Sequence, residues 1–195
     1  MCGIVGYTGE EAAQGILIAG LERLEYRGYD SAGVAIFDGD ELQVVCRKGK
    51  VSQLAHTLGH FDFAGTCGIG HTRWATHGRP SEATAHPHTS CDGRIAVVHN
   101  GIIENFAELR EGLAARESCD LVRAVREATS RVVGSYGLAV VSADEPGVIV
   151  VTRKGSPIVV GRGQRGSYVA SDVIAMIDAA RDVVVLGDGQ TARLD

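Results

Sequence analysis

The apolar segments of this chain come in blocks, and this order limits the fold more than any other feature. Two short apolar runs, Ser31–Phe37 and Leu42–Arg47, flank Asp38-Gly39-Asp40, a turn sequence typical of a β-hairpin. Apolar residues recur at helical spacing over 11–26 and again over 51–58, where the pattern stops at Gly59. Hairpins and helices grouped in this way favour antiparallel sheets covered by helices over parallel βαβ units. We therefore predict an α+β fold.

The other elements follow from the same periodicity rules. Strands are expected at 3–8, 66–72, 94–99 (broken at Asn100-Gly101), 138–142, 148–153, 157–160, 168–170 and, as the last strand, 182–186. Further helices are expected at 104–116, 120–133 and, after Asp172, up to Asp178. Pro146-Gly147 predicts a hairpin turn. The polar stretch from Arg73 to Gly93 has little periodicity, and loops of this length are usually functional.

Composition excludes several function classes. The 195 residues suffice for one domain with a substantial core, and the net charge of −5 without a basic run argues against a nucleic-acid partner. No apolar run approaches the roughly 20 residues of a membrane span, and no signal peptide is evident, so a cytoplasmic protein without a membrane partner is expected. The cysteines form no CxxC pair and the histidines show no paired ligand spacing, so we predict free thiols, no metal and no cofactor.

Cys2 is the residue whose chemistry is easiest to interpret as that of a nucleophile. Because cysteine is small, an aminopeptidase can remove Met1, which would leave a thiol and a free α-amine on one carbon. A free thiol has a pKa of about 8.5 and an α-amine of about 7.7–8.0, so the amine can take the thiol's proton. One residue would then supply both nucleophile and base. By itself, the position also fits a cysteine that happens to follow the start codon.

Three polar blocks lie at the ends of predicted strands. They are Glu25-Tyr26-Arg27-Gly28-Tyr29-Asp30-Ser31-Ala32-Gly33, His71-Thr72-Arg73-Trp74-Ala75-Thr76-His77-Gly78 (continuing to Ala85-His86-Pro87-His88) and Val98-His99-Asn100-Gly101-Ile102-Ile103-Glu104-Asn105. A purely structural role would not require Arg, Trp, Thr and His within five residues, so these blocks indicate a site.

With these blocks and its Cys-Gly-Ile-Val-Gly opening, the chain resembles the glutaminase domain of glutamine-fructose-6-phosphate aminotransferase, also called glucosamine-6-phosphate synthase. The resemblance continues to Gly155-Ser156-Pro157 and Ala170-Ser171-Asp172. It implies a class II amidotransferase with the N-terminal nucleophile hydrolase fold, a four-layer αββα sandwich of two antiparallel sheets between helix layers. It also implies hydrolysis of L-glutamine to glutamate and ammonia, normally for the conversion of fructose 6-phosphate to glucosamine 6-phosphate.

The resemblance implies roles for four catalytic residues. Cys2 would form a thioester with the glutamine side chain, the Asn100 side chain and the Gly101 backbone N–H would form the oxyanion hole, and Arg27 would order the loop around the nucleophile. On their own, Asn100-Gly101 also fit a simple turn.

Substrate binding is implied for a second group. Arg73 would grip the α-carboxylate through its guanidinium fork, with Thr76 and His77 nearby, and Trp74 would gate an ammonia path. A surface salt bridge for Arg73 and core packing for Trp74 are the structural alternatives. His86 and His88 are expected to organise the loop.

The chain departs from the family in three places. Thr84 stands where the family usually has asparagine. Judged against helix lengths, roughly two dozen residues that carry the acid for the substrate's α-amino group are expected to be absent around 117–120, either through a true deletion or because the given sequence omits a segment. Asp120 is the candidate replacement for that acid. The chain, expected to be one glutaminase domain over 1–195, lacks the sugar-isomerase domains, so ammonia would go to such a domain or to a synthase partner.

Alternatives follow from these departures. They are a degenerate glutamine-sensing or docking module, the glutaminase of another class II amidotransferase, and an N-terminal nucleophile amidase for another amide, which Arg73 disfavours. A homodimer is left open.

Overall fold

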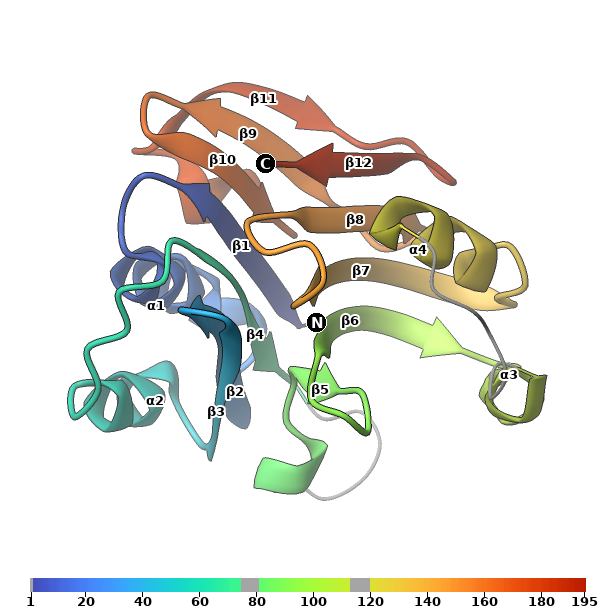
Figure 1. Ribbon diagram of the computed structural model, residues 1–195, viewed down its shortest axis with the longest axis horizontal. Coiled ribbons are helices and arrows are strands. Elements are labelled where there is room, and N and C mark those ends of the chain that lie inside the picture. Colours follow the sequence, from blue (N-terminus) through green and yellow to red (C-terminus); the bar gives the residue numbers. More distant parts are fainter. Residues whose placement is uncertain (1, 75–80, 113–119) are drawn as a thin grey trace.

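The computed structural model describes residues 2–74, 81–112 and 120–195. Two antiparallel sheets form its centre (Figure 1). The first sheet has the order β11-β9-β10-β1-β4-β2-β3, with bounds Ala180–Val185, Val159–Gly163, Gly166–Ala170, Gly3–Gly9, Cys67–Arg73, Ser31–Asp38 and Glu41–Lys48. The second has the order β12-β8-β7-β6-β5, with bounds Thr191–Leu194, Ile149–Lys154, Gly134–Ser142, Ile95–Ile103 and His88–Thr89.

Helices cover the outer face of each sheet. On the first sheet lie α1 (Ala13–Leu24) and α2 (Val51–Leu58), which contact each other and the strands below. On the second lies α4 (Leu121–Thr129), which contacts β7, β8 and β12, while α3 (Phe106–Gly112) follows β6. Three 3-10 turns complete the described elements: η1 (Glu25–Arg27), η2 (Glu82–Thr84) and η3 (Val173–Met176).

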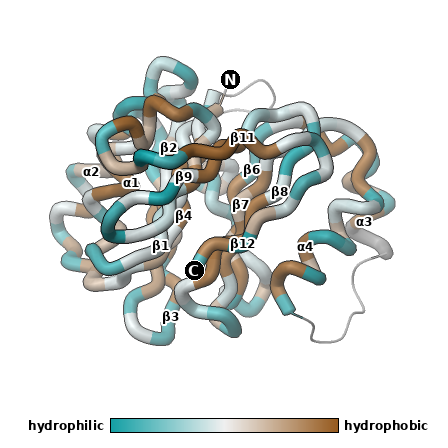
Figure 2. The backbone as a smooth tube through the Cα atoms, turned by 90° about the horizontal axis from the view of Figure 1, so that it is seen from above, coloured by the Kyte–Doolittle hydropathy of each residue, from teal (hydrophilic) through white to brown (hydrophobic). Residues whose placement is uncertain are grey.

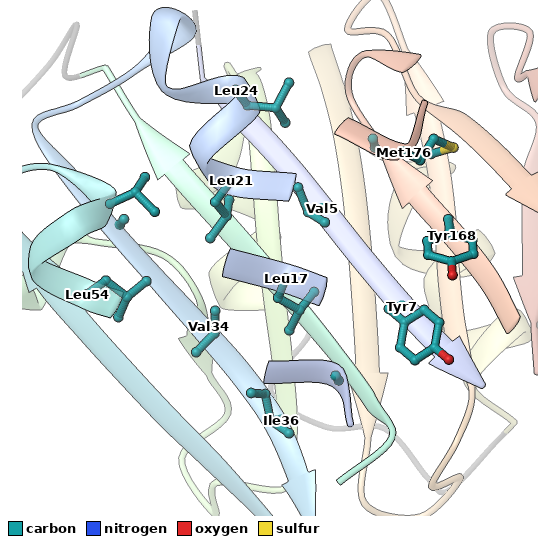
Figure 3. Close-up of a cluster of buried hydrophobic side chains, with 14 of the residues drawn as sticks. Val5, Tyr7, Leu17, Leu21, Leu24, Val34, Ile36, Leu54, Tyr168 and Met176 are labelled. Carbon is teal, nitrogen blue, oxygen red and sulfur yellow. The ribbon is translucent and has the colours of Figure 1, made fainter. Parts of the chain in front are cut away.

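Three hydrophobic clusters correspond to the three interfaces between these layers. The first joins α1 and α2 to the first sheet, with Leu17 and Leu21 of α1 over Val5 and Val34 (Figure 3). The second fills the space between the sheets, and in Figure 2 apolar stretches run along β6, β7 and β8. The third places Val125 of α4 on the outer face of the second sheet. The layers are therefore helix, sheet, sheet and helix, which confirms the α+β sandwich.

The predicted secondary structure is largely confirmed. The hairpin at Asp38-Gly39-Asp40 forms, the helix over 51–58 has the bounds expected, and the Asp172 side chain caps η3 by accepting the Ile174 N–H. Three predictions were wrong. The helix expected up to Asp178 is only the four-residue 3-10 turn η3, which ends at Met176. The strand over 94–99 does not break at Asn100-Gly101, because β6 continues to Ile103 in register with β7. The last strand is β12, which follows the one predicted over 182–186.

In the described part of the chain, no helix combines the length and apolarity needed to cross a membrane.

Candidate active site

Strand periodicity brings Cys2 and Asn100 to one edge of the space between the sheets. Side chains two positions apart on a strand share a face. Ile4 of β1 and Val98 of β6 both belong to the cluster between the sheets, so Cys2 and Asn100 face the same space one step further along. The two residues are 98 positions apart in the sequence, and only the stacking of the sheets joins them.

The neighbouring strand β4 contributes to the same edge. It pairs with β1 so that Gly3 lies opposite Thr72. Ile69 belongs to the cluster between the sheets, and by the same alternation His71 and Arg73 face the second sheet. Three strands that are distant in sequence thus direct polar side chains to one point.

Cys2 is half-buried and has polar neighbours. Its Sγ lies 3.7 Å from the carbonyl oxygen of Trp74 and 3.4 Å from the backbone nitrogen of Trp74. The Nδ2 of Asn100 donates to the carbonyl oxygen of Cys2 at 3.2 Å. The start of β1 lies beside β6 in Figure 1. The thiol therefore lies against the Trp74 backbone and does not point into packed hydrocarbon, and the Asn100 amide contacts the backbone carbonyl of the same residue.

Gly101 occupies a position that only glycine fits. Its φ is +117°, and an added Cβ would lie 2.2 Å from the carbonyl oxygen of Ser135 on β7. Because a side chain would collide with the paired strand, the backbone at this point stays bare. The Asn100-Gly101 pair is thus part of a strand whose backbone is exposed at Gly101, and it is not a turn.

Arg27 is linked to the start of β1, beside Cys2, through one intervening residue, Ser171. Its buried guanidinium donates through Nη1 to the carbonyl oxygen of Ser171 at 3.1 Å and lies 3.3 Å from an oxygen of Asp172. The Ser171 hydroxyl in turn accepts the Ile4 N–H at 3.1 Å. Arg27 therefore stabilises the start of β1, next to the thiol of Cys2, through Ser171.

The first two polar blocks pack against each other. An added Cβ at Gly28 would lie 2.6 Å from the carbonyl carbon of Arg73, so glycine permits this close approach. Asp30 donates its N–H to the Arg73 carbonyl at 3.1 Å. The Tyr29 and Trp74 rings meet edge to face at 5.1 Å, and both are about half exposed. Trp74 is thus paired with an aromatic ring at the surface and is not a core residue.

Arg73 is held by the loop that follows it. Its Nη1 donates to the Thr84 hydroxyl at 3.0 Å, and Thr84 closes a reciprocal pair of hydrogen bonds with Ser81 at the start of η2. Thr84 is the position at which the family usually has asparagine. Thr76 and His77, the other predicted substrate contacts, lie outside the described residues.

Four histidines cluster beneath these residues. The His86 ring lies 4.5 Å from His71, 4.3 Å from His88 and 6.4 Å from His99. Burial lowers the pKa of His71 to about 3 and that of His86 to about 2, so both rings are neutral at pH 7. Among residues 2–74, 81–112 and 120–195, no group of three metal-binding side chains has a geometry that could hold an ion.

His71 is a site residue that sequence reasoning missed. It is 1% exposed, and its Nε2 lies 3.0 Å from the Oδ1 of Asn100. The available signal was its spacing: His71 lies two positions before Arg73 on a predicted strand, and therefore on the same face.

Asp120 does not join this group. Its side chain caps α4 by accepting the Arg123 N–H at 2.9 Å, and the next residue, Leu121, donates to Glu145 in the turn after β7. Asn100 pairs with Gly137, so the turn lies five strand positions further along β7, about 17 Å away at the usual rise. Helix capping thus accounts for Asp120, and the substitute acid expected there is not at the candidate site.

Comparison with known proteins agrees with this geometry. No protein-family model matches the chain. Over its full length it is 49% identical to the glutamine–fructose-6-phosphate aminotransferase of Symbiobacterium thermophilum and 42% identical to that of Aquifex aeolicus. It covers 35% and 36% of these proteins, so it spans about a third of the length of the curated relatives it matches.

The first of these alignments also bears on chain length. Because 215 aligned positions accommodate 195 residues, about 20 positions of the relative have no counterpart here. This number of missing positions is close to the shortening predicted around 117–120. Residues 117–119 lie outside the described part of the chain.

Solved structures share the fold. The glutamine phosphoribosylpyrophosphate amidotransferase of B. subtilis, solved with ADP and GMP, matches 98% of this chain and 48% of its own with a TM-score of 0.78 and 21% identity. A glutamine aminotransferase class-II domain protein of Silicibacter pomeroyi matches 98% of both chains with a TM-score of 0.59 and 14% identity. These likenesses concern the fold, and they agree with the predicted two-sheet sandwich.

Proposed function

Because this chain belongs with the N-terminal domains of the glutamine–fructose-6-phosphate aminotransferases, we propose that it hydrolyses L-glutamine to glutamate and ammonia, with Cys2 as the nucleophile. The observation that carries the proposal is the Asn100 amide, whose Nδ2 donates to the backbone carbonyl oxygen of Cys2 at the edge between the sheets. A fixed amide donor at the residue that carries the thiol can stabilise the oxyanion that forms during acyl transfer to sulfur.

The reaction begins when Met1 has been removed and Cys2 carries a free α-amine. The amine takes the thiol proton, and sulfur attacks the carboxamide carbon of glutamine. The negative charge that develops on the carboxamide oxygen is stabilised by the Asn100 Nδ2 and the Gly101 N–H. The tetrahedral intermediate collapses to a thioester as the protonated amine gives its proton to the leaving nitrogen, which departs as ammonia.

Water completes the cycle. Activated by the same amine, it attacks the thioester carbon, and the same two donors stabilise the second oxyanion. Release of glutamate returns the thiol to Cys2. In this scheme the α-amine is the base, because the pKa values of His71 and His86, lowered to about 3 and about 2 by burial, make these rings weak bases.

Substrate recognition rests on Arg73. We assign its guanidinium to the α-carboxylate of glutamine, because a planar fork binds a carboxylate through two parallel hydrogen bonds. The Thr84 hydroxyl accepts from Nη1, which orients the fork. Thr76 and His77 are assigned to the same pocket, and Trp74, packed on Tyr29, to the path by which ammonia leaves.

The ammonia acceptor follows from the relatives. Their name describes transfer to fructose 6-phosphate, so we assign the product to a sugar-phosphate isomerase domain or a separate synthase, which makes glucosamine 6-phosphate. We place the protein in the cytoplasm, where thiols such as the four described free cysteines persist. Another class II amidotransferase acceptor is the alternative.

The decisive experiment labels the purified protein with a glutamine analogue carrying a diazoketone electrophile and measures its mass. We expect a chain without Met1, one label on Cys2, and ammonia release from glutamine that disappears in Cys2→Ser. Cys91→Ser is the matched control, because Cys91 is exposed and should keep full activity. Retention of Met1, or labelling of another thiol, would contradict the proposal.

A second candidate is a glutamine-binding module with little activity. The position of Asp120, far from Cys2, favours it, because nothing on α4 then replaces the acid that binds the substrate's α-amino group. This candidate predicts that calorimetry detects glutamine binding while no ammonia appears. Ammonia release at a rate that depends on Cys2 excludes it.

A further inference from the structure

The orientation of the Asn100 amide decides whether the proposed oxyanion hole exists. An asparagine side chain has a donor end and an acceptor end of nearly equal size. If the amide turned by half a revolution, its oxygen would face Cys2, and the donor would be lost from the site without any change in shape. The Cys2 carbonyl oxygen only accepts, so it favours the donor end of the amide on its side, and the group at the other end must match the acceptor end.

His71 is in contact with the other end of that amide. Its Nε2 lies 3.0 Å from the Asn100 Oδ1, while the Asn100 Nδ2 donates to the Cys2 carbonyl at 3.2 Å. Because a carboxamide oxygen only accepts, the His71 Nε2 must carry the proton. With the proton on Nδ1 instead, a lone pair of Nε2 would face Oδ1 and would oppose the orientation that the Cys2 carbonyl favours.

The position of His71 is fixed on several sides. Its ring is 1% exposed, and the His86 ring covers one face at 4.5 Å and 33°. Its backbone lies between β1 and β2, opposite Ile4 and Gly33. A buried ring held by two strands and a stacked neighbour has little freedom to turn, so it presents the Nε2–H at a constant place.

The neutral state of His71 suits this role. Burial lowers its pKa most, the hydrogen bonds to the Asn100 side chain and the His99 backbone raise it, and the charges of His99 and Arg73 lower it further. A neutral imidazole has one N–H and one lone pair, so only the tautomer with the proton on Nε2 can donate to the Asn100 Oδ1.

We propose that His71 is a positioning residue: its Nε2–H holds the Asn100 amide with the Nδ2 turned towards Cys2. The expected effect on kcat rests on the proposed glutaminase function, whereas the contact between His71 and Asn100 does not depend on it. His71 neither touches the substrate nor moves a proton in the reaction.

Three substitutions at position 71 separate positioning from packing. His71→Gln keeps a donor at the end of the side chain, where Nε2 lies. His71→Asn is also an amide, but it is one bond shorter and falls short of Asn100. His71→Phe keeps a flat ring against His86 and removes the donor. We expect His71→Phe and His71→Asn to lower kcat about 10²-fold with KM changed less than about threefold, and His71→Gln to recover most of the loss.

A double-substitution cycle adds a second kinetic readout. If His71 acts only through the Asn100 amide, His71→Phe should not lower kcat further once Asn100→Ala is present. Equal kcat values for His71→Gln and His71→Asn, or full additivity with Asn100→Ala, would overturn the proposal.

Nuclear magnetic resonance of the ¹⁵N-labelled chain tests the contact without any turnover. We expect a neutral His71 with the proton on Nε2, and slowly exchanging Asn100 side-chain amide protons that exchange faster in His71→Phe. A proton on Nδ1, or unchanged exchange, refutes the positioning role. A parent chain that shows the expected spectrum but releases no ammonia would instead refute the proposed function.

Discussion

Asn100→Ala tests the proposed oxyanion hole most directly. The parent side chain is 8% exposed and makes two hydrogen bonds, at 3.2 Å to the Cys2 carbonyl and at 3.0 Å to the His71 Nε2. Truncation removes one of the two proposed oxyanion donors. Loss of such a donor usually lowers kcat about 10²–10³-fold, which corresponds to about 2.7–4 kcal/mol of transition-state stabilisation.

The same substitution should also lower the free energy of unfolding. It leaves the buried Nε2–H of His71 without a partner, and an unsatisfied buried donor costs about 1–3 kcal/mol. The assay therefore needs both readouts: ammonia release at saturating glutamine, and urea unfolding of the same preparation. We expect kcat to fall by far more than the small unfolded fraction could explain.

Asn105→Ala is the matched control. The Asn105 side chain also makes two hydrogen bonds, to the Arg131 carbonyl at 2.8 Å and from the Val133 N–H at 2.9 Å, in the loop after β6. It should lose stability without a large change in kcat. If folded Asn100→Ala keeps kcat within about threefold of the parent, the amide does not stabilise the oxyanion and the reasoning is refuted.

Three further predictions concern the surroundings of the site. Gly101→Ala should destabilise the fold by more than about 1 kcal/mol, because its Cβ would lie 2.2 Å from the Ser135 carbonyl oxygen; an unchanged melting temperature would contradict this. Arg73→Lys should raise KM for glutamine about tenfold or more with a smaller effect on kcat, since a point charge replaces a fork; a KM equal to the parent's would remove Arg73 from the carboxylate site. His71 and His86 have pKa values lowered to about 3 and about 2, so the unfolded chain binds more protons below its ordinary histidine pKa. The free energy of unfolding should therefore fall as the pH drops from about 6.5 towards 4, by up to about 1.4 kcal/mol per unit for each ring, and a flat profile in urea titrations would show that the rings are not buried neutral.

Local patterns predicted most of the elements because the signals were local. The turn at Asp38-Gly39-Asp40 and the alternation in β2 need only neighbouring residues to be recognised. The same logic failed at Asn100-Gly101, which is a frequent turn sequence. Here the pairing with β7 extends β6 through Asn100-Gly101, and the paired residues of β7 lie more than thirty positions away in the sequence.

The candidate site shows the same division. Its residue types were evident from the three polar blocks, and the resemblance assigned their roles. The contact between His71 and Asn100 was not evident, because it depends on how the two sheets stack. Asp120 was misplaced for a related reason: its cap at the start of α4 is local, but its distance from Cys2 depends on where that helix packs on the second sheet.

The sequence alone determined the kind of fold, the candidate nucleophile Cys2 and the set of polar side chains, since these depend on residue type and on spacing along one strand or helix. Only the tertiary structure decided which of those side chains meet. Cys2 precedes β1 and His71 lies on β4 in the first sheet, whereas Asn100 lies on β6 in the second, and burial of the apolar faces between the sheets brings them together.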